Sequence, residues 1–329
     1  MRRSYSSNTS IASDLGPLGT LQKPEASTLF KGPQKRPSAS VDQTSSCPID
    51  SIKSHFTAQQ LQKDTAGNPI TPEFWSHKLQ KSPEGKDIVV HYCRSLKSSE
   101  NIAQLFLEDD LLGLDLEWKA SASAWGSIQD NVSLIQIANR HRIALFHVAL
   151  FKPARGIADL VAPTLKRIIE DPAITKAGVS IKADCTRLRK FLKIDAHGIF
   201  ELSHLHKLIK YCQSNPKLIN KRLVNLSEQV EEHFGLPLQK EETVRCSEWT
   251  ATLNYRQVQY AASDPYACVC LYDKMDAKRQ ALDPTPPLPA HAELNIPIRV
   301  VCKAPVTADL EEVEVVQPGD APKNSKCTI

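Results

Sequence analysis

The sequence lacks any apolar run long enough to cross a membrane, since none approaches the roughly 18–20 residues that a transmembrane helix needs. Its opening residues, MRRSYSSNTS, also lack the apolar core of a secretory signal. These absences argue against a membrane protein and against a secreted protein. We therefore expect no membrane partner.

The spacing of a zinc site is missing too, although the chain has nine cysteines. Cys268 and Cys270 are separated by one residue, which is too close for a usual zinc knuckle. An odd number of cysteines without a secretory signal indicates reduced thiols in an intracellular protein. The formal net charge of +4 is small and gives only weak evidence for a polyanionic partner.

Two patterns near the N-terminus bear on location within the cell. The first forty residues are rich in Arg and Ser and poor in acids, as in mitochondrial transit peptides. The stretch KGPQKRPS (31–38) resembles a nuclear localisation signal. We expect an intracellular protein and favour the nucleus over the mitochondrion.

Composition divides the chain into a folded part between two tails. The first tail is rich in Ser, Pro, Thr and Lys, and the second contains DPTPPLP and the acidic stretch DLEEVEVV. Such compositions are typical of disordered segments. We predict a disordered N-terminal tail over 1–55, a folded domain over 56–280 and a disordered C-terminal tail over 281–329. An alternative for IPIRVVC (296–302) is that it docks on a partner protein as an added strand.

The folded part alternates between strand-type and helix-type apolar periodicity. The expected strands cover 87–93, 111–117, 132–138, 142–149 and 174–181. The expected helices cover 98–108, 157–171, 182–194, 201–212, 223–235 and 254–275. A hairpin-containing sheet with helices before, between and after it is a mixed α/β fold.

The apolar strand LLGLDLE contains two acids, Asp115 and Glu117. Because side chains alternate along a strand, both acids lie on one face, roughly 7 Å apart, and repel each other. One interpretation is an edge strand with a solvated face. The other is a metal site, since a bound cation would remove the repulsion.

Further acids lie in two later segments. In VQYAASDPY, Tyr260 and Asp264 are four residues apart on a helix and point the same way. Asp264 could instead be a helix N-cap, because Pro265 follows it. In GVSIKADCTRL, Asp184 lies in the first turn of a helix, where an acid is also favoured by the helix dipole.

DLEW, AGVSIKADCTRL and SEWTATLNYRQVQYAASDPYA, in this order, resemble the three motifs of the DEDD exonucleases. The Tyr four residues before the last Asp is typical of the tyrosine subclass, DEDDy, which includes the exonuclease domain of the Werner syndrome helicase and the ribonuclease D group. The resemblance covers about 87–278 and extends to the flanking stretches VSLIQIA and LVNLSEQVEEHFG. It implies a ribonuclease H-like fold, with a mixed five-stranded sheet flanked by helices.

The resemblance also implies a reaction and the residues that perform it. Two Mg²⁺ or Mn²⁺ ions would bind at the carboxylates, with Asp115 bridging both, Glu117 and Asp264 completing the first site, and Asp184 holding the second. The Tyr260 hydroxyl would orient the attacking water. The expected function is metal-dependent 3′-5′ exonuclease activity that releases nucleoside 5′-monophosphates from the 3′ end of DNA or RNA.

The chain departs from the family pattern at three positions and lacks helicase motifs. Cys185 and Thr186 stand where the Werner-type domain carries a large aromatic residue, and Pro265 stands where Ala is more usual. The absence of GxxxxGK[ST] predicts a stand-alone nuclease module. The alternatives are a catalytically inactive nucleic-acid-binding scaffold on the same fold and an RNA-trimming enzyme of the ribonuclease D type. A helicase or another protein partner is left open.

Other residues are weaker candidates for contacts with nucleic acid. The helix expected at 182–194 carries Lys182, Arg187, Arg189, Lys190 and Lys193. These residues, and the turn at 140–142 (RHR), could bind phosphates, or they could belong to a solvated surface. Trp118 and Trp125 could stack on bases, and for Trp118 the alternative is a place in the core.

Overall fold

The computed structural model describes residues 72–300 of the chain. Its strands are β1 (Val89–Cys93), β2 (Leu111–Glu117), β3 (Leu134–Ala138), β4 (Arg142–Phe146), β5 (Thr175–Gly178) and β6 (Ile199–Glu201). Its α-helices are α1 (Leu96–Ala103), α2 (Ile128–Asn131), α3 (Pro163–Glu170), α4 (Ile181–Leu192), α5 (Leu202–Tyr211), α6 (Leu226–Phe234), α7 (Glu242–Arg245) and α8 (Tyr255–Gln280). The tail predicted over 1–55 and the KGPQKRPS segment lie outside the described residues. Among residues 72–300, no helix is long and apolar enough to span a membrane.

The strands form one six-stranded sheet in the order β1-β4-β3-β2-β5-β6. β3 runs antiparallel to β2 and β4, and the other neighbouring strands are parallel. The predicted mixed α/β fold and its β3–β4 hairpin are confirmed. The sheet has six strands rather than the five that the resemblance implied. The additional strand, β6, has three residues and leads directly into α5, so its short apolar pattern merges with that of the helix.

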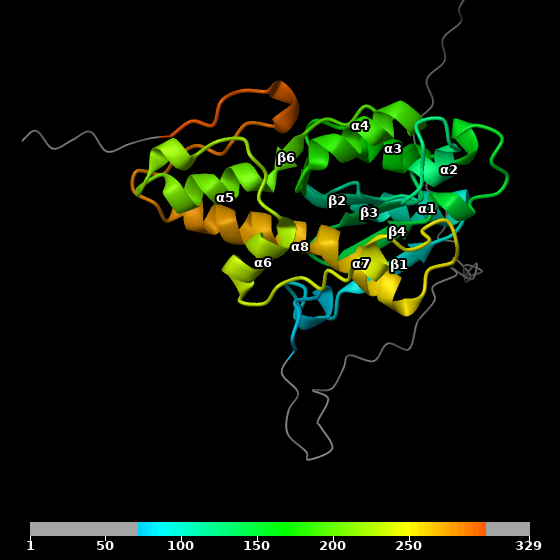
Figure 1. The fold of residues 1–329 in the computed structure, drawn as a ribbon, viewed down its shortest axis with the longest axis horizontal. Coiled ribbons are helices and arrows are strands. Elements are labelled where there is room, and N and C mark those ends of the chain that lie inside the picture. Colours follow the sequence, from blue (N-terminus) through cyan, green and yellow to red (C-terminus); the bar gives the residue numbers. More distant parts are fainter. Residues whose placement is uncertain (1–71, 301–329) are drawn as a thin grey trace, which may run out of the picture. The chain divides into compact units, whose positions relative to one another are not determined.

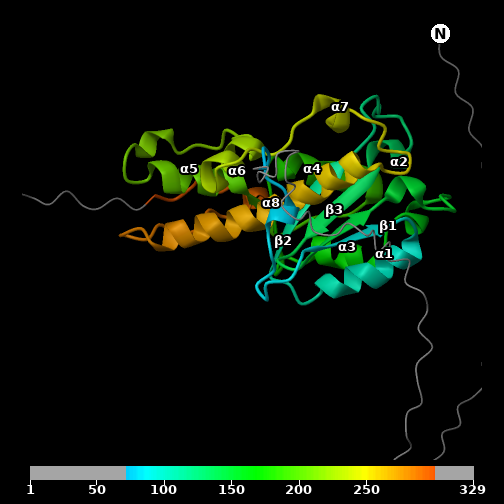
Figure 2. The same ribbon diagram turned by 90° about the horizontal axis from the view of Figure 1, so that it is seen from below.

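Helices cover both faces of the sheet (Figure 1). The core on one face includes residues of α1, α3 and α4 together with Leu112, Leu114 and Leu116 of β2. The core on the other face includes residues of α5, α6 and α8. Figure 2 shows α8 crossing the strands on this second side. The predicted alternation along β2 is confirmed, and the face that carries Asp115 and Glu117 is the one turned toward α8.

The close approach of α8 to β2 depends on Gly113. A Cβ atom at this position would lie 1.8 Å from the carbonyl oxygen of Pro265, far inside van der Waals contact. Only glycine therefore lets the helix backbone lie directly on the strand at this point. The contact brings Asp264, the residue before Pro265, to the face of β2 that carries Asp115.

Residues 281–300, predicted as the beginning of a disordered tail, pack on the domain. The Glu293 carboxylate accepts hydrogen bonds from the backbone N–H groups of Gly198 (2.6 Å) and Ile199 (3.1 Å). Ile298 packs against the core on the α8 side. The described part of IPIRVVC is not a strand, and the remainder of that segment lies outside the described residues.

Gly113→Ala should lower the free energy of unfolding by about 3 kcal/mol, because the added methyl group must displace the Pro265 backbone. Gly156→Ala is the matched control, since a Cβ there would have no atom within 4 Å and should change the free energy by less than about 0.5 kcal/mol. Urea unfolding of both variants and the wild type measures the difference. Equal unfolding midpoints for the two variants would contradict a required close approach.

Candidate active site

β2 places Asp115 and Glu117 in the middle of the domain. The strand lies between β3 and β5, so the edge-strand interpretation is wrong. Asp115 is paired in register with Gln136 of β3, and Glu117 with Leu134. Glu117 is buried and Asp115 is half-buried. Two neighbouring acids on one face of a central strand have little contact with solvent that would screen their repulsion.

α4 supplies Asp184 from the strand-to-helix junction after β5. The N-cap of this helix is Ser180, whose backbone is left-handed (φ 60°) and whose side chain makes no capping bond. Asp184 lies one turn further on and is buried. It is therefore not the N-cap residue, and its carboxylate faces other acids rather than the helix N-terminus alone.

α8 supplies Tyr260 and Asp264 from one face of a continuous helix. The helix runs from Tyr255 to Gln280 with Pro265 in its interior, so the interpretation of Asp264 as an N-cap is wrong. Asp264 is buried, and Tyr260 packs against Trp249 with their ring centroids 6.1 Å apart. The spacing of four residues predicted that both side chains share a face, and the helix confirms it.

The four carboxylates lie close enough to act on one another. Burial raises the pKa of Asp115 well above its usual range, and the charges of Asp264 and Asp184 raise it further. Burial and then the charges of Asp115, Asp264 and Asp184 do the same to the pKa of Glu117. Among residues 72–300, none of the four forms an ion pair with a basic side chain within 4 Å. When its acids are ionised, the cluster thus holds negative charge that no ion pair balances.

Partial compensation comes from two basic residues and from Tyr260. Burial raises the pKa of Asp264 to about 6, while the charge of Lys240 and the hydrogen bond from Tyr260 act to lower it. Burial raises the pKa of Asp184 to about 7, the nearby Arg187 guanidinium lowers it, and the Glu201 charge raises it.

The pKa of the Tyr260 phenol is itself raised, first by burial and then by the charges of Asp264, Glu117 and Asp115. The phenol therefore stays neutral at physiological pH.

The donor set suits a hard divalent cation. Such ions are bound by carboxylate oxygens together with water and substrate oxygens, and a cation would cancel the repulsion among these acids. Gln136, opposite Asp115, is fully buried, and the hydrogen bond of its side chain to Glu117 acts to lower the pKa of that carboxyl. Within the described part of the chain, however, no three His, Cys, Asp or Glu side chains are already spaced to hold a metal ion.

Two residues that affect the pKa values of the carboxylates were not predicted from the sequence. Glu201, at the end of β6, is buried and its charge acts on Asp184. Lys240 is exposed, donates a 2.7 Å hydrogen bond to Asn225, and acts electrostatically on Asp115 and Asp264. Neither residue lies in a recognisable motif, because each reaches the site through tertiary packing alone.

A buried hydrogen-bond network supports the Trp249–Tyr260 contact and was also not predicted. The Nε2 atom of His147 lies 2.8 Å from the Trp249 carbonyl oxygen. Because a carbonyl oxygen can only accept, this nitrogen carries the hydrogen and donates the hydrogen bond. The Nδ1 atom then accepts from the Tyr92 hydroxyl at 2.6 Å, and the Tyr92 oxygen accepts from the Leu253 N–H at 3.2 Å. These bonds fix the loop that leads from Trp249 into α8.

The basic turn between β3 and β4 does not serve the site. Arg140 makes two 2.8 Å hydrogen bonds to Asp273 of α8, and His141 is paired with Glu84. The turn follows Ala138, which pairs with Gly113, so it lies at the opposite end of β2 from Glu117. Arg140 and His141 therefore tie the turn to neighbouring parts of the fold, and this replaces the interpretation that the turn binds phosphates.

The two tryptophans after β2 differ in exposure. Trp118 is half-buried, and one face of its ring is covered by the Arg187 guanidinium at 4.0 Å. Trp125 is 95% exposed. That its ring stacks on a nucleic-acid base remains a prediction.

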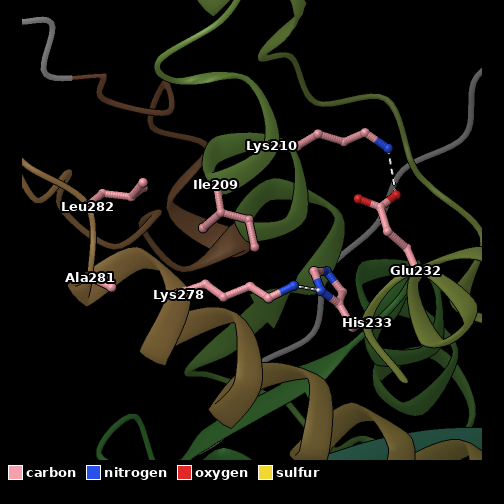
Figure 3. A pocket seen from close by; sticks show the side chains of 7 residues that line it. All are labelled: Ile209, Lys210, Glu232, His233, Lys278, Ala281 and Leu282. Carbon is pink, nitrogen blue, oxygen red and sulfur yellow. Dashed lines mark hydrogen bonds and ion pairs between the residues drawn. The ribbon is translucent and has the colours of Figure 1, made fainter. Parts of the chain in front are cut away.

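A cavity of about 350 Å³ lies away from the carboxylates, and its lining residues are Ile209, Lys210, Glu232, His233, Lys278, Ala281 and Leu282. In Figure 3, Lys210 is paired with Glu232 (2.5 Å) and Lys278 donates to His233 (2.8 Å). Lys278 follows Asp264 by fourteen residues on α8, which is about 21 Å along a helix. The polar groups of the cavity are thus paired with one another, far from the acidic site.

Fold and site together define an α/β domain with an acidic centre between a central strand and two helices. A family model described as 3′-5′ exonuclease matches residues 88–280, which is more than half of the chain. The chain therefore belongs to the 3′-5′ exonuclease family, and this region is its exonuclease domain.

Two curated relatives show the extent of the similarity. The bifunctional 3′-5′ exonuclease/ATP-dependent helicase WRN of Mus musculus is 27% identical over 179 residues, which cover 54% of this chain and 12% of the relative. The exonuclease 3′-5′ domain-containing protein 2 of Homo sapiens is 27% identical over 249 residues, which cover 74% of this chain and 37% of the relative. The chain thus matches well under half of the length of either relative.

Solved structures with a similar fold include the Nibbler EXO domain of Aedes aegypti and RNase D of Escherichia coli. The Nibbler domain has a TM-score of 0.48 and 20% identity, and the match covers 58% of this chain and 88% of that one. RNase D has a TM-score of 0.47 and 18% identity, and the match covers 59% of this chain and 46% of that one.

Asp184→Asn should stabilise the metal-free protein in a pH-dependent way. The folded-state pKa of Asp184 is about 7 against an ordinary value of 3.8, so the folded chain holds a proton that the unfolded chain has released. Stability from this group is full below about pH 4 and is lost as the pH rises through about 7. Asn has no such loss, so the variant should be the more stable protein at pH 8 and equal to wild type near pH 4.

Thermal unfolding of both proteins in EDTA, from pH 4 to pH 8, measures this difference. The comparison with wild type cancels buried histidines such as His147, whose pKa is lowered to about 4 and whose effect has the opposite sign. A difference in stability that does not change with pH would exclude a carboxylate with a raised pKa at position 184.

Proposed function

We propose that the chain is a metal-dependent 3′-5′ exonuclease of the tyrosine subclass, which hydrolyses nucleic acid from the 3′ end and releases nucleoside 5′-monophosphates. The observation that carries the proposal is the mutual electrostatic effect of Asp115, Glu117, Asp184 and Asp264, which three different elements bring together. Membership in the 3′-5′ exonuclease family supports it.

The four carboxylates would hold two Mg²⁺ or Mn²⁺ ions, which would supply charge neutralisation at the phosphate and a water of lowered pKa. Tyr260 would orient the attacking water through its hydroxyl. A phenol with a raised pKa stays protonated, so it positions the water by hydrogen bonding and does not act as its base. Trp249, held by His147, would fix the ring of Tyr260.

An inactive nucleic-acid-binding scaffold is the competing proposal. The complete set of four buried or half-buried acids, with Tyr260 one helical turn before Asp264, supports the active enzyme instead. Buried charges that repel one another cost stability, and a protein that never bound cations would have no use for this cost.

A nuclease assay with Asp115→Asn tests the proposal. Wild type should shorten 5′-labelled substrates stepwise from the 3′ end with Mg²⁺ or Mn²⁺ and should be inactive in EDTA. The substrates are a 3′-recessed DNA duplex, single-stranded DNA and single-stranded RNA, which also decides between DNA hydrolysis and RNA trimming. Asp115→Asn keeps the side-chain shape but removes a ligand charge, so activity should fall by about 100-fold or more.

The matched control is Glu108→Gln, which removes an exposed acid just before β2 and should leave the rate unchanged. Undiminished cleavage in EDTA, or cleavage by Asp115→Asn at the wild-type rate, would remove the metal site from the proposal. Binding of all three substrates without cleavage would favour the scaffold.

Tyr260→Phe should lower the single-turnover rate at least about tenfold, which corresponds to about 1.4 kcal/mol of barrier. Only the hydroxyl is lost, so packing against Trp249 and substrate affinity should stay near wild type. Tyr272→Phe, which removes a hydroxyl further along the same helix, is the control. If both variants reacted at the wild-type rate, Tyr260 would have no part in the mechanism and the tyrosine-subclass assignment would fall.

A further inference from the structure

Among the five basic residues of the α4 region, Arg187 alone is turned toward the site. Lys182, Arg189, Lys190 and Lys193 are exposed, whereas Arg187 is half-buried. It lies three residues after Asp184, on the same side of α4. Its charge lowers the pKa of Asp184, which places the guanidinium beside that carboxylate.

The Arg187 guanidinium is held in one orientation by contacts with Trp118, Asn131 and Phe191, and its Cζ atom lies 5.9 Å from the Phe191 ring centroid. It lies over the ring of Trp118, with 4.0 Å between Cζ and the ring centroid. Its Nη1 atom donates to the backbone oxygen (3.0 Å) and to the side-chain oxygen (3.1 Å) of Asn131. Asn131 is buried, and its own amide donates to the carbonyl oxygens of Ser123 and Ser127. The group is therefore fixed by stacking on one face and by hydrogen bonds at one nitrogen.

The remaining donors of Arg187 are free within the described residues. Its Nε and Nη2 atoms have no hydrogen-bond acceptor in residues 72–300, and no carboxylate lies within 4 Å as an ion-pair partner. Trp118, on which the group lies, directly follows Glu117. An oriented cation with two unused donors thus lies between two of the carboxylate-bearing elements, β2 and α4.

We infer that Arg187 binds a phosphate of the substrate strand next to the carboxylate cluster. The inference rests on the proposed function, because it assumes that a nucleic-acid strand enters this site. A guanidinium presents its donors in a fixed fork that matches phosphate oxygens, and stacking on an aromatic ring holds the fork in place before the ligand arrives. Lysine would supply the charge but neither the fork nor the stacked geometry.

The test compares Arg187→Gln with Lys190→Gln. Each removes one positive charge from α4, but Lys190 is exposed and lies over Phe191 rather than Trp118. The probes are fluorescein-labelled single-stranded oligonucleotides of about twelve nucleotides, one DNA and one RNA, and binding is followed by fluorescence anisotropy in Ca²⁺ from 50 to 300 mM salt. No turnover is needed for this measurement.

Arg187→Gln should raise the Kd about tenfold and reduce the slope of log K against log salt by about 0.7, the value for one phosphate contact on a single strand. Lys190→Gln should leave the Kd within about twofold and the slope unchanged. Arg187→Lys should keep the wild-type slope while raising the Kd, because the charge remains and the fork is lost. Thermal unfolding of each variant checks that it is folded.

The failures of the inference and of the proposed function are distinguishable. If wild type binds neither oligonucleotide, the proposed function fails and the inference fails with it. If wild type binds but Arg187→Gln matches Lys190→Gln in Kd and slope, the inference alone is wrong. Should Arg187→Gln be unfolded, Arg187→Lys decides, and a wild-type Kd for that variant would overturn the role of the fork.

Discussion

The contact between the Pro265 carbonyl and Gly113 is the constraint on which the rest of the site depends. It sets the separation of α8 from β2, and with it the separation of Asp264 and Tyr260 from Asp115 and Glu117. Any side chain on Gly113 would force the helix outward. Because Pro265 has no N–H, one carbonyl of the preceding helical turn also has no intrahelical partner. The helix continues through Pro265 but lacks one backbone hydrogen bond where it meets the strand.

The carboxylates of the site repel one another. Four acids with raised pKa values lie within a mostly buried cluster, and the nearest positive charges, Lys240 and Arg187, act on them without forming ion pairs. Such a cluster stays folded because the sheet and helices around it are well packed, and it gains most from a ligand that brings positive charge. Stability and the capacity to bind cations are therefore opposed at this centre.

Local sequence rules were enough to predict the framework of the site. Alternation along β2 separated Leu112 and Leu114 from Asp115 and Glu117, and the spacing of four residues put Tyr260 and Asp264 on one face of α8. These rules act over a few residues. The family resemblance then supplied the roles that we propose for these residues, which single motifs could not have done.

Long-range contacts set the limit of that prediction. His147 donates a hydrogen bond to the Trp249 carbonyl oxygen, about a hundred residues later in the sequence. The sequence around either residue contains no pattern that predicts this bond. Of five basic residues around α4, only the packing of Trp118 and Asn131 distinguishes Arg187. Two further parts have too little apolar periodicity for their structure to be predicted from the sequence alone. They are the three-residue strand β6 and the proline-rich segment from 281 to 300.

The segment after α8 has a consequence for how copies of this chain meet one another. β6 is one of the two outer strands of the sheet, and an uncovered outer strand offers its amide groups to any other extended chain. Glu293 accepts hydrogen bonds from the amides of Ile199, the first residue of β6, and of Gly198, the residue before it, with a negatively charged side chain. Glu293, which lies beyond the region of the family match, thereby covers the beginning of this sheet edge. A covered edge is less available for strand pairing between two copies of the chain.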